Sequence, residues 1–153
     1  KVIQHDLYIQ KTFGTSFDIA TYLPKVYKDL DVDIALRNFG VAPTFGTYKS
    51  KLPTSLNVAM TYPYKQWMFY EQHNLMKKHM TSGFGVSYKY EVKNQGVVFG
   101  KVGYYKDTMH KLTYPTFGLD LKYDRYFIGM SYIYGDQTLP VSNTFRLTIN
   151  LEI

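Results

Sequence analysis

Residues 144–153 read TFRLTINLEI, and this stretch decides the fold. Apolar side chains occupy every second position from Phe145 to Ile153, and polar side chains fill the positions between them. Successive side chains of a β-strand point to opposite faces of a sheet. Strict alternation therefore predicts a long strand with one apolar and one polar face.

The same alternation recurs along the chain. It is clear in residues 30–37, 55–62, 84–92 and 116–123. By this rule we expect about ten strands, separated by turn signals such as Phe13-Gly14-Thr15 and by a longer loop over 40–53. No window has a convincing 3.6-residue period, so we expect almost no helix. The expected strands lie near residues 5–13, 16–23, 30–39, 54–62, 66–75, 83–92, 96–105, 115–123, 126–134 and 143–153.

Composition separates this chain from an ordinary soluble domain. Aromatic residues make up 18% of the 153 residues, and charged residues make up 20%, against about 25% in globular proteins. No Cys is present, which excludes disulfide frameworks and thiolate zinc sites. The net charge of +6 is spread along the sequence without a helix, zinc or RNP-type motif, so we expect no nucleic-acid partner.

Alternation alone fits a soluble barrel or sandwich as well as a membrane barrel, and three details favour the membrane. The expected strands have about the length that a tilted strand needs to cross hydrocarbon. Their polar sides mix small and charged residues, which suits a wet lumen. Tyr residues gather near strand ends, where a membrane interface favours amphipathic rings. No run of 18 apolar residues occurs, so only strands are left to cross a membrane.

Polar residues opposite the apolar sides are the candidates for a lumen. They form either a structural network that stiffens the barrel or a path for a ligand. These candidates are Asp31, Asp33, Arg37, Asp120, Lys122, Arg146 and Asn150. Exposed aromatics beside basic residues suit a protein interface, although we favour the simpler explanation of an irregular loop and a membrane-interface Trp. The partner-contact candidates are Phe45, Tyr48, Lys49 and Trp67.

Catalytic and metal-binding motifs are missing from the sequence. Neither H-E-x-x-H nor G-x-S-x-G occurs, and His73 and His79 are poorly spaced for a shared metal. Ser142, His110 and Asp136 could meet in space as a Ser–His–acid set, which sequence alone does not show. We therefore expect no enzyme, no metal and no cofactor.

Several segments carry a resemblance to a known family. Residues 16–20 (SFDIA) with 30–40 (LDVDIALRNFG) resemble a pair of strands in the PorV family of FadL-like outer-membrane barrels. Residues 52–56 (LPTSL) are similar to a strand start of that family, and residues 139–149 (LPVSNTFRLTI) to its closing strand. The order and spacing of these segments carry the resemblance, which matches the later half of such a protein.

The resemblance implies an antiparallel up-and-down transmembrane β-barrel in the outer membrane of a Gram-negative bacterium. We expect residues 1–153 to form a single β-barrel domain or the C-terminal part of one, and we favour the latter because a ten-stranded sheet with an edge open to lipid leaves unpaired backbone groups. The alternatives are closure as a small barrel and pairing with strands from elsewhere.

For function, the resemblance implies a noncatalytic role in protein transport by type IX secretion. The partners would be other outer-membrane secretion components, the C-terminal domains of secreted cargo, and the lipid bilayer. Two alternatives stay open: a FadL-like transporter of hydrophobic small molecules, and a soluble ligand-binding β-barrel. Fold analogy by itself does not decide among these.

Overall fold

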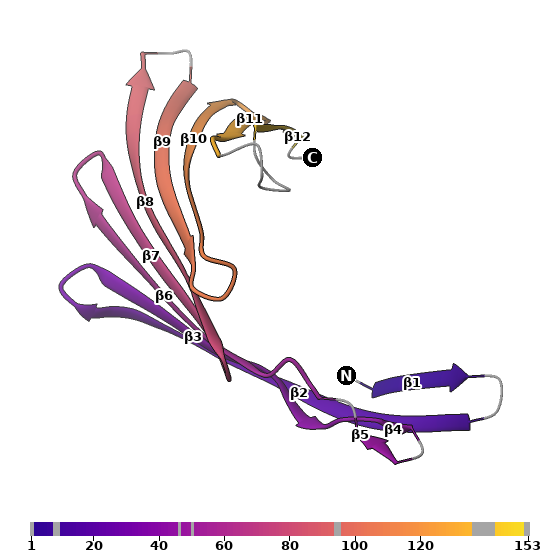
Figure 1. The fold of residues 1–153 in the computed structure, drawn as a ribbon. Helices are drawn as coiled ribbons and strands as arrows, with labels where there is room; N and C mark the ends of the chain where they lie inside the picture. The colour runs from indigo at the N-terminus through magenta and orange to yellow at the C-terminus, as the bar shows by residue number, and fades with distance from the viewer. Residues whose placement is uncertain are drawn as a thin grey trace.

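The computed structural model describes residues 2–7, 10–45, 47–49, 51–93, 96–135 and 143–151. Within these ranges all regular structure is β-strand, which confirms the predicted all-β class. Ten described strands form one antiparallel sheet in which each strand pairs with its neighbours along the chain (Figure 1). Their bounds are β1 Val2–Leu7, β2 Gln10–Tyr27, β3 Leu30–Val41, β6 Ser55–Tyr64, β7 Trp67–Met76, β8 His79–Val92, β9 Gly96–Asp107, β10 Leu112–Tyr123, β11 Tyr126–Ile133 and β12 Thr144–Leu151.

From Leu30 onward the strands lie close to where alternation predicts them. The expected loop over 40–53 holds a small hairpin, β4 (Thr44–Phe45) and β5 (Tyr48–Lys49), that forms a separate two-stranded sheet. The strand expected to end at residue 134 ends at Ile133. Residues 152–153 of the last expected strand lie outside the described residues.

The expected turn at Phe13-Gly14-Thr15 is wrong. β2 runs without a break through these residues, and β1 pairs with its first half. Gly14 is needed there for a close approach, because a Cβ at this position would lie 2.7 Å from Cδ of Pro43. The glycine therefore allows the chain to pack against a neighbouring segment rather than to reverse direction.

One bulge bends the long hairpin of β2 and β3. The register shifts between Phe17 and Ile19, and Asn38 on β3 has a positive φ of 53°. The Asn38 backbone N–H donates a hydrogen bond of 2.8 Å to Oδ1 of Asp18. The Asp18 side chain thus binds a backbone group that the bulge removes from the ladder.

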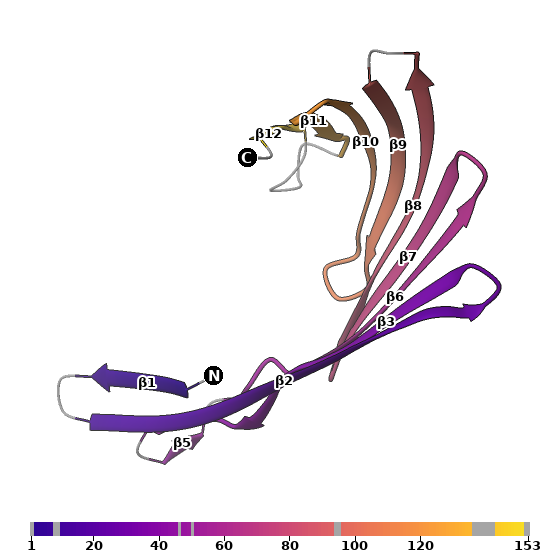
Figure 2. The same cartoon turned by 180° about the vertical axis from the view of Figure 1, so that it is seen from behind.

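The sheet is strongly curved and open. Figures 1 and 2 show β10 to β12 curling over at one side, whereas β1 and the first half of β2 extend away at the other. Among the described residues β1 pairs only with β2, and β12 only with β11, so two edges are free. The accessible surface is 11814 Å², against roughly 8,000 Å² for a compact monomer of this mass.

The two ends of the sheet differ in their connections. At one end the strands are joined by the short connections 28–29, 65–66, 93–95 and 124–125. Lys28, Lys65 and Asp124 there have φ values of 54°, 56° and 50°, the left-handed backbone that tight hairpin turns use. The other end carries the connections 42–54, 77–78, 108–111 and 134–143. We name them the short-turn end and the long-loop end.

No helix in the part of the chain that the structure describes is both long enough and apolar enough to cross a membrane.

Candidate functional site

The strand register sorts the side chains into two faces. Residues directly opposite each other on neighbouring strands share a face, and the pairing is unbroken from β3 to β12. The apolar face contains Val32, Ile34, Leu36, Leu56, Val58, Met60, Tyr62, Tyr64, Trp67, Phe69, Phe84, Val86, Tyr88, Tyr90, Val98, Val102, Tyr104, Phe117, Leu119, Leu121, Tyr123, Tyr126, Ile128, Met130, Phe145, Leu147, Ile149 and Leu151. We call the opposite side the polar face.

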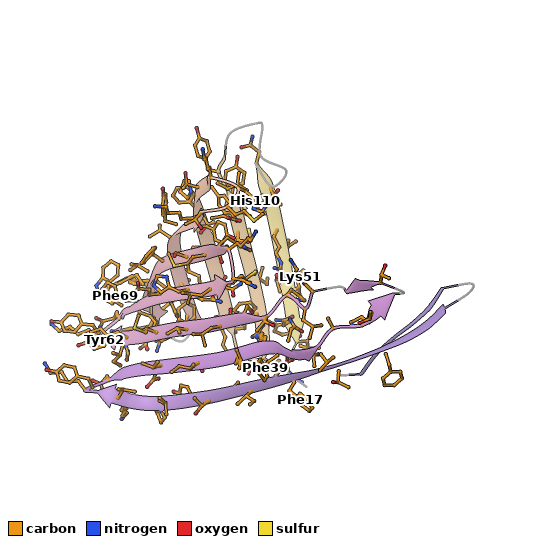
Figure 3. All side chains as sticks on the ribbon, turned by 60° about the horizontal axis from the view of Figure 1, so that its bottom comes forward. Phe17, Phe39, Lys51, Tyr62, Phe69 and His110 are labelled. Carbon is orange, nitrogen blue, oxygen red and sulfur yellow. The ribbon has the colours of Figure 1, made fainter. Side chains whose placement is uncertain are left out.

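Burial on this sheet is inverted relative to a soluble protein. On β12 the apolar-face side chains of Phe145, Leu147, Ile149 and Leu151 are between 54% and 67% exposed. Ala42 is the one buried hydrophobic residue in the described ranges, and the buried polar residues other than Ser82 belong to the polar face or its extension along β2. Figure 3 shows the cross-strand pairs Phe17 with Phe39 and Tyr62 with Phe69 side by side.

All seven lumen candidates lie on the polar face. Asp31, Asp33 and Arg37 alternate along β3, opposite Thr61, Ala59 and Ser55 of β6. The other four come from β10 and β12, which flank β11. They are Asp120, Lys122, Arg146 and Asn150. Two separate groups result, because the strands from β6 to β9 stand between them.

Asp31 and Asp120 show how candidates are bonded on the polar face. Tyr22 Oη donates a hydrogen bond of 2.7 Å to Oδ2 of Asp31, and the backbone N–H of Lys25 donates one of 2.9 Å to Oδ1. Asp120 is 7% exposed and forms an ion pair with Lys101 on β9. Sequence reasoning missed Lys101, whose partner is set by the diagonal register of β9 and β10.

The partner-contact candidates do not gather in one place. Phe45, Tyr48 and Lys49 belong to the β4–β5 hairpin at the long-loop end, and only their backbone is described. Trp67 begins β7 beside turn 65–66, at the short-turn end. Its ring contacts that of Tyr88 on the apolar face, with centroids 4.7 Å apart.

Three polar side chains interrupt the apolar face at the β7–β8 hairpin. His73 and Ser82 are direct cross-strand partners, and Glu71 lies two residues before His73 on the same face. The Nδ1 atom of His73 lies 2.9 Å from Ser82 Oγ, and its Nε2 atom lies 2.7 Å from Glu71 Oε1. The sequence signal for this cluster is the break in apolar alternation along β7, but only the register brings Ser82 to it.

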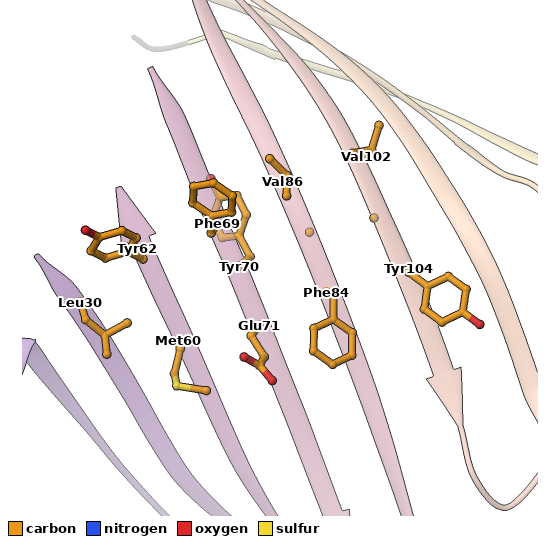
Figure 4. A pocket seen from close by; sticks show the side chains of 12 residues that line it. Leu30, Met60, Tyr62, Phe69, Tyr70, Glu71, Phe84, Val86, Val102 and Tyr104 are labelled. Atoms are coloured by element: carbon orange, nitrogen blue, oxygen red, sulfur yellow. The ribbon is translucent and has the colours of Figure 1, made fainter. Parts of the chain in front are cut away.

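A shallow apolar hollow adjoins this cluster. It has a volume of about 530 Å³ and is lined by Met60, Phe69, Glu71, Phe84, Val86 and Val102 among others. Figure 4 shows Glu71 between Met60 and Phe84, its cross-strand neighbours. Glu71, whose carboxylate bonds to His73, is therefore part of the lining of the hollow.

The set of Ser142, His110 and Asp136 that the sequence suggested is described by the structure only at His110. Ser142 and Asp136 lie outside the described residues. His110 Nδ1 instead lies 2.9 Å from Oδ2 of Asp107, whose Oδ1 accepts a hydrogen bond from the Met109 backbone. His110 thus helps to hold the turn after β9, and its ring faces that of His79 at 6.4 Å.

Comparison with known proteins gives no significant match: no family model, no curated protein and no solved structure resembles the chain. The likeness to PorV-like barrels therefore stays a prediction from the residues themselves.

Proposed function

We propose that this chain crosses a membrane with its strands, as a component of an outer-membrane β-barrel in a Gram-negative bacterium. The observation that carries the proposal is the inverted burial: large apolar side chains stay exposed over one whole face, while buried polar groups belong mainly to the other. In water such a face would be an extreme apolar patch. Against acyl chains it is the expected exterior of a barrel.

The ends of the strands support the same setting. At the short-turn end, Tyr64 with Trp67 and Tyr123 with Tyr126 flank two hairpins on the apolar face. Aromatic girdles at the membrane interface and short periplasmic turns are features of outer-membrane barrels. We therefore assign the short-turn end to the periplasm and the long-loop end to the cell surface.

The free edges of β1 and β12 bear on how such a barrel would close. Unpaired backbone N–H and C=O groups are strongly disfavoured in hydrocarbon. We propose that further strands complete the wall, either from the same polypeptide or from another chain.

For the role of the barrel we propose protein secretion of the type IX kind, in which it receives the C-terminal domains of secreted cargo together with other secretion components. The support is the resemblance of residues 16–40, 52–56 and 139–149 to PorV-like strands. The β4–β5 hairpin adds to it, because it lies at the long-loop end, where cargo would arrive at the surface.

A second candidate is a FadL-like transporter of hydrophobic small molecules. It is favoured by a hollow of about 450 Å³ on the polar face, lined by Tyr70, Tyr105 and Tyr114 among others. The rings of Tyr105 and Tyr114 stack there with centroids 4.9 Å apart. The third possibility, a soluble ligand-binding barrel, conflicts with the exposure of the apolar face.

Single-cysteine variants test the membrane setting, because the chain has no native Cys. We expect Leu147→Cys, on the apolar face, to be protected in lipid vesicles from a water-soluble maleimide. Arg146→Cys, one residue earlier on the polar face, should react at least tenfold faster. Equal labelling, or a chain that stays monomeric in buffer without detergent, would refute the proposal.

Capture of cargo tests secretion against transport. Replacement of the β4–β5 hairpin by a Gly-Ser linker should abolish copurification of a cargo C-terminal domain. Trp67→Ala, at the opposite end, should leave capture unchanged within about twofold. Failure of the unmodified barrel to retain cargo, together with uptake of a fluorescent fatty acid, would favour the transporter instead.

A further inference from the structure

The polar cluster of Glu71, His73 and Ser82 lies in the wrong place for a structural network. It sits on the exposed apolar face, with Met60, Val58 and Phe84 as cross-strand neighbours. Charged side chains on a lipid-facing surface cost most at the bilayer midplane and least near the interface, and ionisable residues within membrane spans often mark functional sites. The polar face of the same hairpin, by contrast, has room for such groups and already carries Gln72 and Asn74.

The hydrogen bonds order the three side chains as acid, histidine and serine. An ionised Glu71 carboxylate can only accept, so its contact of 2.7 Å places a proton on His73 Nε2. The lone pair of Nδ1 then faces Ser82 Oγ at 2.9 Å. An orienting carboxylate, a neutral imidazole and a hydroxyl in this sequence make an activated nucleophile.

We propose that Ser82, His73 and Glu71 hydrolyse an ester bond of an acylated membrane lipid. Ser82 is the nucleophile and His73 the general base, while Glu71 is a positioning residue that acts through His73. This inference rests on the proposed membrane setting of the apolar face. It also replaces the expectation of a noncatalytic chain. The labelling and hydrolysis experiment below decides whether the chain is catalytic.

The surroundings select an acyl ester as the substrate. The apolar hollow of about 530 Å³ has Glu71 in its lining (Figure 4). Met60, Phe69 and Phe84 in its lining suit a hydrocarbon chain. Ser82 is only 5% exposed, which favours the approach of a slender extended chain over that of a bulky head group.

The position along the strands is near the outer edge of the hydrocarbon region, next to the ester groups of a bilayer. His73 and Ser82 are close to turn 77–78 at the long-loop end, and Lys77 and Lys78 form that turn. Lys106 on β9 is the direct partner of Ser82 on the same face. The register therefore brings a cationic side chain to the same part of this face, where it would favour an anionic lipid head group.

The reaction balances in two steps. The Ser82 hydroxyl gives its proton to His73 Nδ1 as Oγ bonds to the ester carbonyl carbon. The carbon–alkoxy bond then breaks, and the alcohol leaves with the proton from Nδ1. In the second step water attacks the acyl–Ser82 ester, gives a proton to Nδ1, and the Oγ–carbon bond breaks. Ser82 recovers its proton, and a free fatty acid leaves.

The test uses the full chain folded into lipid vesicles. A small fluorophosphonate should form one adduct on Ser82, read by mass spectrometry, and fatty acid should appear from the vesicle phospholipid. Ser82→Ala and His73→Gln should remove the adduct and lower hydrolysis at least about a thousandfold. Ser87→Ala is the matched control, a buried serine of β8 on the polar face, and should keep both within twofold.

Glu71→Gln separates positioning from a structural role. It should lower kcat with little change in KM and alter the pH profile of the rate, while the fold, read by circular dichroism, stays intact. A properly inserted chain with neither adduct nor hydrolysis overturns the triad and leaves the membrane proposal standing. A chain that fails the maleimide test but cleaves a short water-soluble nitrophenyl ester overturns the membrane setting, and with it the lipid substrate, and leaves only the triad standing.

Discussion

At the scale of single residues, two of the three glycines of β9 illustrate how neighbours decide what a position tolerates. Gly96 has a φ of +114°, and a Cβ there would lie 2.3 Å from the Lys122 carbonyl oxygen. Gly100, four residues further along β9, has no heavy atom within 4 Å of an added Cβ. Both look alike in the sequence, where each marks only a glycine within a strand.

Gly96→Ala should therefore destabilise the sheet by about 1–3 kcal/mol, since alanine disfavours that φ and clashes with β10. Gly100→Ala should change stability by less than about 0.5 kcal/mol. Urea unfolding in vesicles measures both, with fluorescence of Trp67 as a single probe because the chain has one Trp. Equal effects of the two substitutions would contradict the argument.

At the scale of elements, strand existence was predictable and contact partners were not. The alternation of residues 116–123 is a local property of the sequence, so it predicted most of β10 without knowledge of the neighbouring strands. The turn expected at Gly14 failed because its glycine serves a contact with Pro43, a segment far along the chain. Ser82 and Lys101 were missed for a similar reason: their partners depend on the register between strands, which alternation leaves undetermined.

The Lys101–Asp120 pair between β9 and β10 shows what such a register contact contributes. Asp120→Ala should destabilise the sheet by about 1–2 kcal/mol, because it leaves Lys101 without its partner and the half-exposed lysine recovers only some hydration. Glu91→Ala, which removes the exposed pair with Lys89, should cost less than about 0.5 kcal/mol. Denaturant midpoints in vesicles compare the two, and a larger loss for Glu91→Ala would count against this ranking.

At the scale of the whole molecule, the sequence predicts two faces but neither curvature nor closure. Phe117 and Leu119 would lie on the same face of β10 whether the sheet were open or closed into a barrel. Curvature comes from twist and from bulges such as that at Asp18 and Asn38, where the left-handed backbone at Asn38 gives only a weak sequence signal. The free edges at β1 and β12 likewise follow from pairing across the sheet.

The apolar side of β8 has one more consequence. It runs from Met80 to Tyr90, interrupted at Ser82, which corresponds to roughly 25 Å along the bilayer normal for a tilted strand. An average hydrocarbon core of about 30 Å would have to be compressed around it, whereas the thinner bacterial outer membrane would need little deformation. Lipid length alone should then bias where this protein resides, with short-chain bilayers accommodating it best.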